Sequence, residues 1–262
     1  VIDNTELAQN RGKYQIVNLL QSKQAIAKIS MINDLARQLY ADGGEGTATP
    51  KEINGLQSMI EFATPATQAK TVGGIAKANY AEWRNQYGVM TAFGTDGLDV
   101  WEEVYMDCSK KGTHPDIILT DPTVYRFFKR LVAPNQEERD VAMWNQGFEN
   151  LLFNGTPVVP DEELSGTGKT FFLTTSGKRG VTDFNLKPEY FEVPGKNPLV
   201  QGKGTAIGLQ LAILSSDDFR QTEFMTPPNS DVILSHTYFT SMLVASSLSR
   251  QGCTKFSGAI QF

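Results

Sequence analysis

The chain has 262 residues, of which 40% are hydrophobic and 20% are charged, as expected of one large globular domain or two interleaved ones. Its formal net charge of −5 and pI near 5.2 argue against a protein whose main task is to grip nucleic acid, because such binding depends on Lys and Arg against phosphate. The chain contains no apolar run of about 18 residues, so no membrane-spanning helix is predicted, and no signal peptide is visible.

The first predicted element is a long amphipathic helix over residues 14–41, a stretch without Pro or Gly. Its apolar residues recur at the spacing of one helical face: Ile16, Leu19, Leu20, Ile26, Ile29, Ile32, Leu35, Ala36 and Leu39. Gly43 or Gly44 can end the helix in the left-handed conformation. We expect this apolar stripe to pack on the protein's own sheet, so that Ile32→Asp would unfold the protein. The polar side of the helix would face solvent or a neighbour.

The middle of the chain predicts two further helices and a buried strand. Asp96 is placed to cap a helix over residues 96–111, and one face of that helix carries Leu98, Trp101, Tyr105 and Cys108. Residues 117–119 form an apolar run without alternation, which is typical of a strand buried on both faces. Asp121 is then placed to cap a helix that has Pro122 at its first position.

The remainder of the chain predicts mainly strands. Asn154-Gly155 indicates a tight hairpin turn, and residues 169–174 a further strand. Residues 205–215 and 232–248 are rich in β-branched and apolar side chains, and the second stretch is long enough for an extended strand, with a helix as the alternative. Residues 254–261 predict a last strand. The fold class is therefore α+β.

One segment resembles the end of a phosphate-binding loop, the sequence GTGKT at residues 166–170. The complete motif needs a Gly five residues before Gly168, where this chain has Glu163, and it needs a helix afterwards, where a strand is predicted. The acidic residues 161–163 would also repel phosphate. Nucleotide binding is therefore disfavoured.

The other reactive side chains form no recognisable site. His114 and His236 are the two histidines, and no Gly-x-Ser-x-Gly motif accompanies them. Cys108 and Cys253 show no metal-ligand spacing with them and indicate two reduced thiols in a cytosolic protein. The acidic pairs are adjacent in sequence, so their side chains point apart: Glu102-Glu103 and Asp217-Asp218. We predict no catalytic residue, no cofactor and no metal site.

A series of stretches resembles the major capsid protein of tailed bacteriophages, the family with the Hong Kong 97 fold. In chain order they are Ile53 to Leu56, Gly73 to Ile75 followed by Trp83, Pro115 to Tyr125, Phe153 to Asp161 with Gly168 to Leu173, and Tyr238 to Ile260. In order and spacing they cover most of residues 11–262. The resemblance implies a structural protein and no enzyme.

The resemblance also implies an architecture with a long spine helix, a peripheral domain and an axial domain. Residues 1–50 would be the end of an extended loop and the spine helix, residues 51–176 the axial domain, and residues 177–262 the sheet of the peripheral domain. Copies would assemble in the host cytoplasm into hexamers and pentamers, which close into the icosahedral phage head of the virion around double-stranded DNA. Scaffold, portal and decoration proteins would be partners, the DNA would be contacted non-specifically, and no membrane would be involved.

The chain departs from this family at its N-terminus. It begins with Val1 rather than Met, so we expect a processed or partial chain. In some members a Lys of the extended loop joins covalently to an Asn of a neighbour, but this chain begins too late to show that loop. Two alternatives stay open: an encapsulin-type nanocompartment, which shares the fold but encloses protein cargo, and a nucleotide-binding enzyme that uses the P-loop-like segment.

Overall fold

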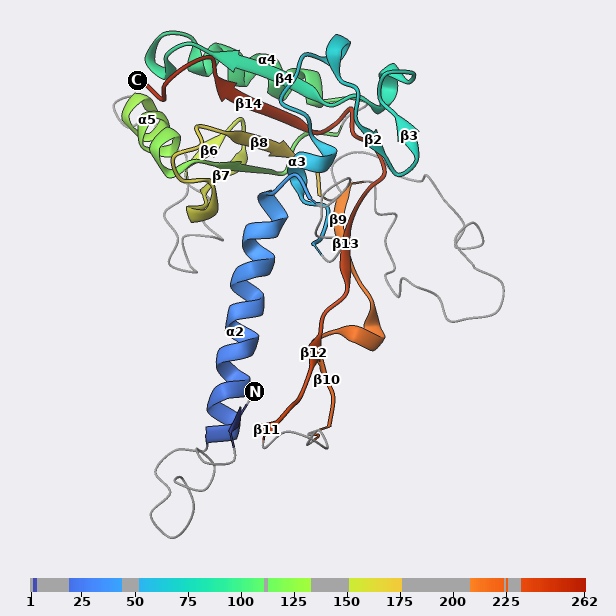
Figure 1. The fold of residues 1–262 in the computed structure, drawn as a ribbon. Helices are drawn as coiled ribbons and strands as arrows, with labels where there is room; N and C mark the ends of the chain where they lie inside the picture. The colour runs from blue at the N-terminus through green and yellow to red at the C-terminus, as the bar shows by residue number, and fades with distance from the viewer. Residues whose placement is uncertain are drawn as a thin grey trace.

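The computed structural model describes residues 2–3, 19–43, 52–110, 113–132, 151–175, 208–223, 225 and 232–262. Helices and strands are mixed, which confirms the α+β class. Figure 1 shows a broad upper part built on a sheet, from which helix α2 (Leu19–Tyr40) and a chain of short strand pairs extend in the same direction. No described helix is long and apolar enough to cross a membrane.

The upper part is organised by a mixed six-stranded sheet. Its strands, in spatial order, are β4 (Gln86–Met90), β14 (Gly252–Phe256), β8 (Thr170–Leu173), β5 (Ile117–Thr120), β7 (Thr156–Pro160) and β6 (Leu152–Phe153). The β14 strand runs parallel to β4 and antiparallel to β8, and β5 runs antiparallel to β8 and parallel to β7. The last strand of the chain therefore lies inside the sheet formed by residues 86–173.

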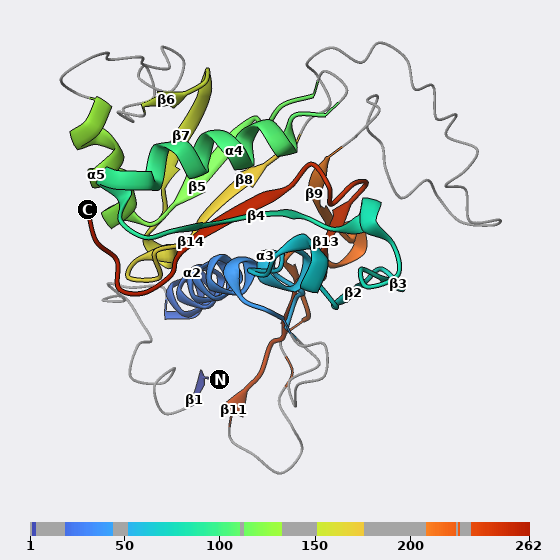
Figure 2. The same ribbon diagram turned by 90° about the horizontal axis from the view of Figure 1, so that it is seen from above.

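The two faces of this sheet are covered by different helices, as the view from above shows (Figure 2). On one face, α4 (Leu98–Cys108) and α5 (Pro122–Val132) bury Trp101 and Phe128 in the first core cluster. On the other face, α3 (Leu56–Met59) and the end of α2 pack in the second cluster. The neighbours Phe172 and Phe171 point into the first and second cluster respectively, as the two-residue period of a strand requires.

Several local predictions are confirmed and one is wrong. Asp121 accepts a hydrogen bond from the backbone N–H of Thr123 (2.7 Å) at the start of α5, as its position in the sequence predicts. Asn154 and Gly155 have φ of 49° and 76°, the left-handed pair of a tight hairpin. Asp96, however, does not cap α4. A turn over Phe93–Gly97 precedes that helix, and the Asp96 carboxylate accepts from the backbone N–H groups of Thr91 and Ala92 instead, which lowers its pKa.

The extended part contains α2 and three antiparallel pairs. They are β9 (Leu209–Ile213) with β13 (Ser241–Ala245), β10 (Arg220–Gln221) with β12 (Thr237–Tyr238), and β1 (Ile2–Asp3) with β11 (Val232–Ile233). The predicted long strand over residues 232–248 is thus divided into three short ones. A further hairpin joins β2 (Thr71–Val72) to β3 (Ile75–Ala76). The predicted helical residues 14–18, and Gly44, lie outside the described residues.

The expectation that the whole apolar stripe of α2 packs on the protein's own sheet is wrong. Among the described side chains of the helix, those that reach the second core cluster are Leu39 and Tyr40, at its C-terminal end. Further along the rod, Ile26, Ile29 and Ile32 are 64%, 58% and 51% exposed. The physical reason is geometric: the sheet lies beyond the end of α2, and a helix of 22 residues projects roughly 33 Å, far beyond that contact.

Candidate assembly surface

The end of α2 is firmly attached to the upper part. Tyr40 donates a hydrogen bond from its hydroxyl to Asp161 Oδ2 (2.6 Å), and its ring lies 6.3 Å from that of Phe171. Burial and the Asp161 carboxylate both raise the pKa of Tyr40. Two residues before Tyr40, the side chain of Gln38 accepts a hydrogen bond at Oε1 from the backbone N–H of Ile53 (3.2 Å). These contacts fix the direction in which the free part of the rod points.

The free part of the rod presents an apolar stripe to solvent. Ile26, Ile29 and Ile32 follow one another at three-residue spacing, with Ala25 beside them, so they share one side of the helix. Burying a whole Ile side chain is worth about 1.5–3 kcal/mol. Three half-exposed isoleucines in a row therefore leave a substantial hydrophobic driving force unused in the isolated chain.

The β9–β13 ribbon shows the same property on both of its faces. Leu209 and Leu243 are buried near the sheet, whereas further residues are exposed: Leu211 36%, Ile213 44%, Met242 60% and Val244 44%. Because Met242 pairs with Ala212 and Leu243 with Leu211, the exposed apolar side chains lie on opposite faces of the ribbon. An isolated two-stranded hairpin is at best marginally stable in water, so this ribbon needs a cover on at least one face.

We call these two elements, the α2 stripe and the β9–β13 ribbon, the shaft surface. Exposed apolar side chains that gather along one element of a folded chain mark a site of association rather than a solvated face. The helical periodicity correctly predicted an apolar stripe, but it could not show that the sheet lies beyond most of the helix.

The P-loop-like segment has a structural role in the described fold. The backbone N–H of Gly168 donates to Asp121 Oδ2 (2.8 Å), so a carboxylate occupies the position that an incoming phosphate would need. Lys169 Nζ donates to Gln57 Oε1 (2.8 Å) and lies 4.9 Å from the centre of the Phe62 ring. The segment thus joins the start of β8 to the cap of α5 and to α3, and its Lys is directed away from a phosphate cradle.

The histidines and cysteines are not brought together. His114 stacks on Tyr105 with ring centres 6.1 Å apart, and His236 is exposed beside Tyr238. Both cysteines are buried and unpaired, and burial raises the pKa of each thiol, so they are poor nucleophiles. The described residues contain no group of three or more His, Cys, Asp or Glu that could hold a metal ion.

A buried polar cluster escaped the sequence analysis. Lys77 is fully buried, and its ammonium donates to the Met59 carbonyl (2.6 Å) and to Asn85 Oδ1 (2.8 Å), with Glu61 Oε1 at 3.5 Å. Burial lowers the pKa of Lys77 to about 8, although the Glu61 carboxylate opposes the shift. Asn85 also accepts from the backbone N–H of Glu61 (2.9 Å). The cluster ties three loops together beside Cys253, and no periodicity could have predicted it.

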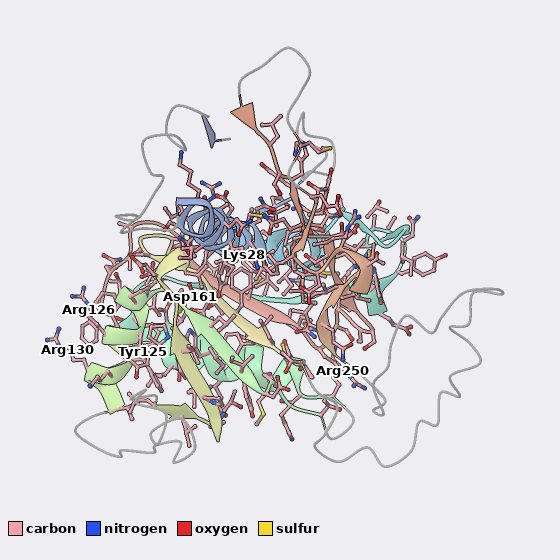
Figure 3. All side chains as sticks on the ribbon, turned by 90° about the horizontal axis from the view of Figure 1, so that it is seen from below. Lys28, Tyr125, Arg126, Arg130, Asp161 and Arg250 are labelled. Carbon is pink, nitrogen blue, oxygen red and sulfur yellow. The ribbon has the colours of Figure 1, made fainter. Side chains whose placement is uncertain are left out.

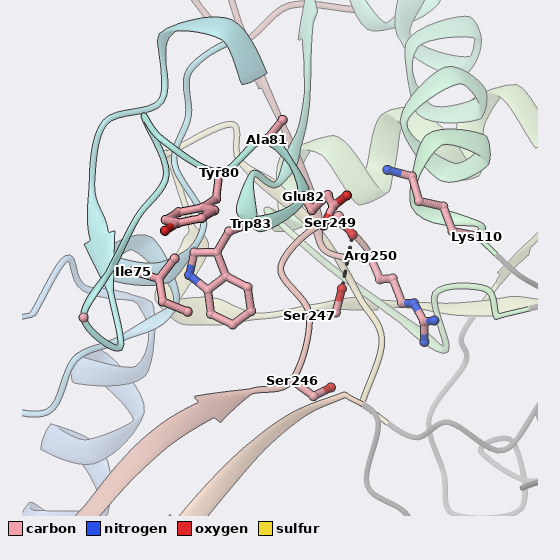
Figure 4. Close-up of a pocket in the computed structure, with 11 residues that line it drawn as sticks. Ile75, Tyr80, Ala81, Glu82, Trp83, Lys110, Ser246, Ser247, Ser249 and Arg250 are labelled. Atoms are coloured by element: carbon pink, nitrogen blue, oxygen red, sulfur yellow. Dashed lines mark hydrogen bonds between the residues drawn. The ribbon is translucent and has the colours of Figure 1, made fainter. Parts of the chain in front are cut away.

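A cleft of about 870 Å³ lies where the β2–β3 hairpin, the end of α4 and the segment before β14 approach one another (Figure 4). Trp83 and Tyr80 lie on one side of it, and Lys110 and Arg250 extend on the other. One guanidinium nitrogen of Arg250, Nη1, is buried without a hydrogen-bond partner in the described part of the chain. Glu82 and serine hydroxyls also line the cleft, and neither histidine does.

Comparison with known proteins identifies shell subunits. No protein-family model matches the sequence, and no curated protein sequence matches it significantly. Among solved structures, a capsid protein from the asymmetric unit of cyanophage A-1(L) matches all of this chain and 76% of its own, with 16% identity and a TM-score of 0.54. The holo-SrpI encapsulin complex from Synechococcus elongatus PCC 7942 matches 93% of this chain and 67% of its own, with 12% identity and a TM-score of 0.53.

One of these structures is a phage capsid and the other an encapsulin complex, and both have the Hong Kong 97-type fold. The resemblance inferred from the sequence is therefore confirmed at the level of the fold. The chain has the fold of a shell-forming protein, the architecture shared by a phage capsid and an encapsulin.

Proposed function

We propose that this chain is the major capsid protein of a bacteriophage, a structural subunit that forms hexamers and pentamers of an icosahedral head around double-stranded DNA. One observation carries the proposal: a chain with the fold of shell subunits holds a rod and a ribbon whose apolar side chains are exposed in the isolated chain. Obligate interfaces bury about 2,000–5,000 Å², and a projecting shaft supplies such area with few residues.

The proposal also assigns the parts of the subunit to two domains. In this proposal the six-stranded sheet with α4 and α5 is the axial domain, formed by residues 51–176 and joined by β14 from the C-terminal segment. Helix α2 and the β9–β13 ribbon, which carry the shaft surface, belong to the peripheral domain, with α2 as its spine. The net charge of −5 suits a container, because a strongly basic inner surface would hold DNA and hinder packaging and release. Scaffold, portal and decoration proteins are its proposed partners, and the virion its proposed location.

The similarity to an encapsulin complex favours a second function, a shell that encloses protein cargo. The two functions differ in content and share the structural role. In both, the subunit acts by association and performs no chemistry of its own.

The decisive experiment is electron microscopy of the purified chain, followed by analysis of what the particles hold. We expect closed shells, and after nuclease treatment and opening we expect protected DNA when the particles come from infected or induced cells. Protein cargo without DNA would show the nanocompartment function instead. A chain that stays monomeric at high concentration under every condition, also when produced with proteins encoded beside it, would refute the shell function altogether.

The enzyme alternative has its own test. A nucleotide-binding protein would show a nucleotide-dependent rise in melting temperature that is lost in Lys169→Ala. Because Lys169 and Gly168 are engaged with Gln57 and Asp121, we expect no such shift in either protein.

A further inference from the structure

The outer face of α4 is acidic throughout. The helix carries four carboxylates and no Lys or Arg, and all four acidic side chains are exposed: Asp99, Glu102, Glu103 and Asp107. Asp99 and Glu103, and likewise Glu103 and Asp107, stand four residues apart, where like charges repel each other on a helix. The exposed Met106 lies among them. The opposite face of α4 is the apolar one that packs on the sheet.

The outer face of α5 is basic throughout. This helix carries no acidic residue, and its exposed side chains include Arg126, Lys129 and Arg130. Figure 3 shows Arg126 and Arg130 extending outward from α5, away from the sheet. The Arg130 guanidinium lies 4.3 Å from the centre of the Phe262 ring, which is itself 39% exposed. Each of the two helices therefore presents one sign of charge together with an apolar side chain.

The two faces do not neutralise each other within the subunit. In the described part of the chain, neither Arg126 nor Arg130 forms an ion pair with an acidic residue of α4. Figure 1 shows the reason: α4 runs along the top of the sheet and α5 lies at one end of it, so their outer faces are on different sides of the molecule. Two complementary patches on different sides of one chain are what a head-to-tail ring requires.

We propose that neighbouring copies around a ring meet through these helices, the acidic face of α4 on one copy against the basic face of α5 on the next. The inference rests on the proposed shell function and adds to it the surfaces that join the upper parts of adjacent subunits. Each subunit uses one acidic and one basic face, so every copy in a closed ring has both faces occupied. In such a ring, the basic face of the neighbour relieves the like-charge repulsion among the carboxylates of α4. Opposite potentials also steer the encounter and disfavour head-to-head contacts.

The test reverses the charges in turn and then together. Glu103→Lys with Asp107→Lys makes the α4 face basic, and Arg126→Glu with Arg130→Glu makes the α5 face acidic. We expect each double variant to raise the concentration needed for assembly at least about tenfold, because like charges then meet in every contact. The quadruple variant exchanges the two signs and should assemble again. The matched control for the α4 variant, Glu162→Lys with Glu163→Lys, raises the net charge by the same amount at exposed positions outside both helices.

Assembly is measured by sedimentation and electron microscopy at low and high salt, and the fold by circular dichroism melting. If a reversed pair fails to fold, the neutral variants Glu103→Gln with Asp107→Asn and Arg126→Gln with Arg130→Gln replace it, with a smaller loss expected. Double variants that fold and assemble like the wild type would overturn the proposal while leaving the shell function intact. A folded quadruple variant that still fails to assemble would also overturn it, since the faces would then bind a different protein. A wild-type chain that never assembles would refute the shell function itself.

Discussion

A charge placed on the α2 stripe separates folding from assembly. Ile32 is 51% exposed, so Ile32→Asp removes little from the interior of the subunit. Surface substitutions of this kind usually change the free energy of unfolding by no more than about 0.5 kcal/mol. We therefore expect the variant to fold and to melt within a few degrees of the wild type, which revises the sequence-based expectation that it would unfold.

The cost to assembly is much larger. Covering the exposed half of an Ile contributes about 1 kcal/mol, and burying a carboxylate without a partner costs at least about 1 kcal/mol more. The sum, about 2 kcal/mol for each contact, corresponds to roughly a 30-fold weaker association. Because a shell repeats the contact in every copy, Ile32→Asp should yield folded subunits and few or no shells.

The assay compares circular dichroism melting of the isolated subunit with particle yield by sedimentation and electron microscopy. Ala27→Asp is the matched control, because Ala27 is exposed on the opposite side of α2 and receives the same charge. Normal shells from Ile32→Asp would show that the stripe is not an interface. Loss of the fold in Ile32→Asp but not in Ala27→Asp would show that the stripe is covered within the subunit, and the reasoning would fail.

Two further predictions concern the upper part. Lys77→Met should destabilise the subunit by about 3 kcal/mol, because Glu61 and Asn85 lose their buried cation. The pKa of Lys77 is lowered from 10.5 to about 8, so between these pH values the unfolded chain binds more protons than the folded one. The free energy of unfolding should therefore rise with pH across that window in the wild type but not in Lys77→Met. Denaturant unfolding at several pH values checks this. Gly168→Ala should cost about 1–3 kcal/mol, because φ is 62° and a Cβ would lie 2.9 Å from Ile260, whereas Gly166→Ala, with φ of 74° and open space, should cost less in the same assay.

Short sequence motifs made one helix start and one turn of the upper part predictable. The Asp121-Pro122 start of α5 and the Asn154-Gly155 turn depend on neighbours in sequence, and both are where the pattern places them. The insertion of β14 between β4 and β8 was not predictable, because strand order is decided by contacts across more than 80 residues. The Lys77 cluster belongs to the same class: its partners come from separate loops, and only the folded chain brings them together.

The long helix shows where such reasoning stops. Amphipathic spacing predicts that one face of α2 is covered, but it carries no information on whether the covering surface belongs to the same chain. In an ordinary globular domain the two cases coincide, because most helices lie along their own sheet. Among the described side chains of α2, Leu39 and Tyr40 pack in the core cluster on the sheet. The rest of the stripe, from Ile26 to Ile32, is not covered by the described part of the chain. The same argument applies to the β9–β13 ribbon, whose two apolar faces one helix could not cover at once. In the proposed function, association with other copies supplies that surface and completes the hydrophobic core of the subunit.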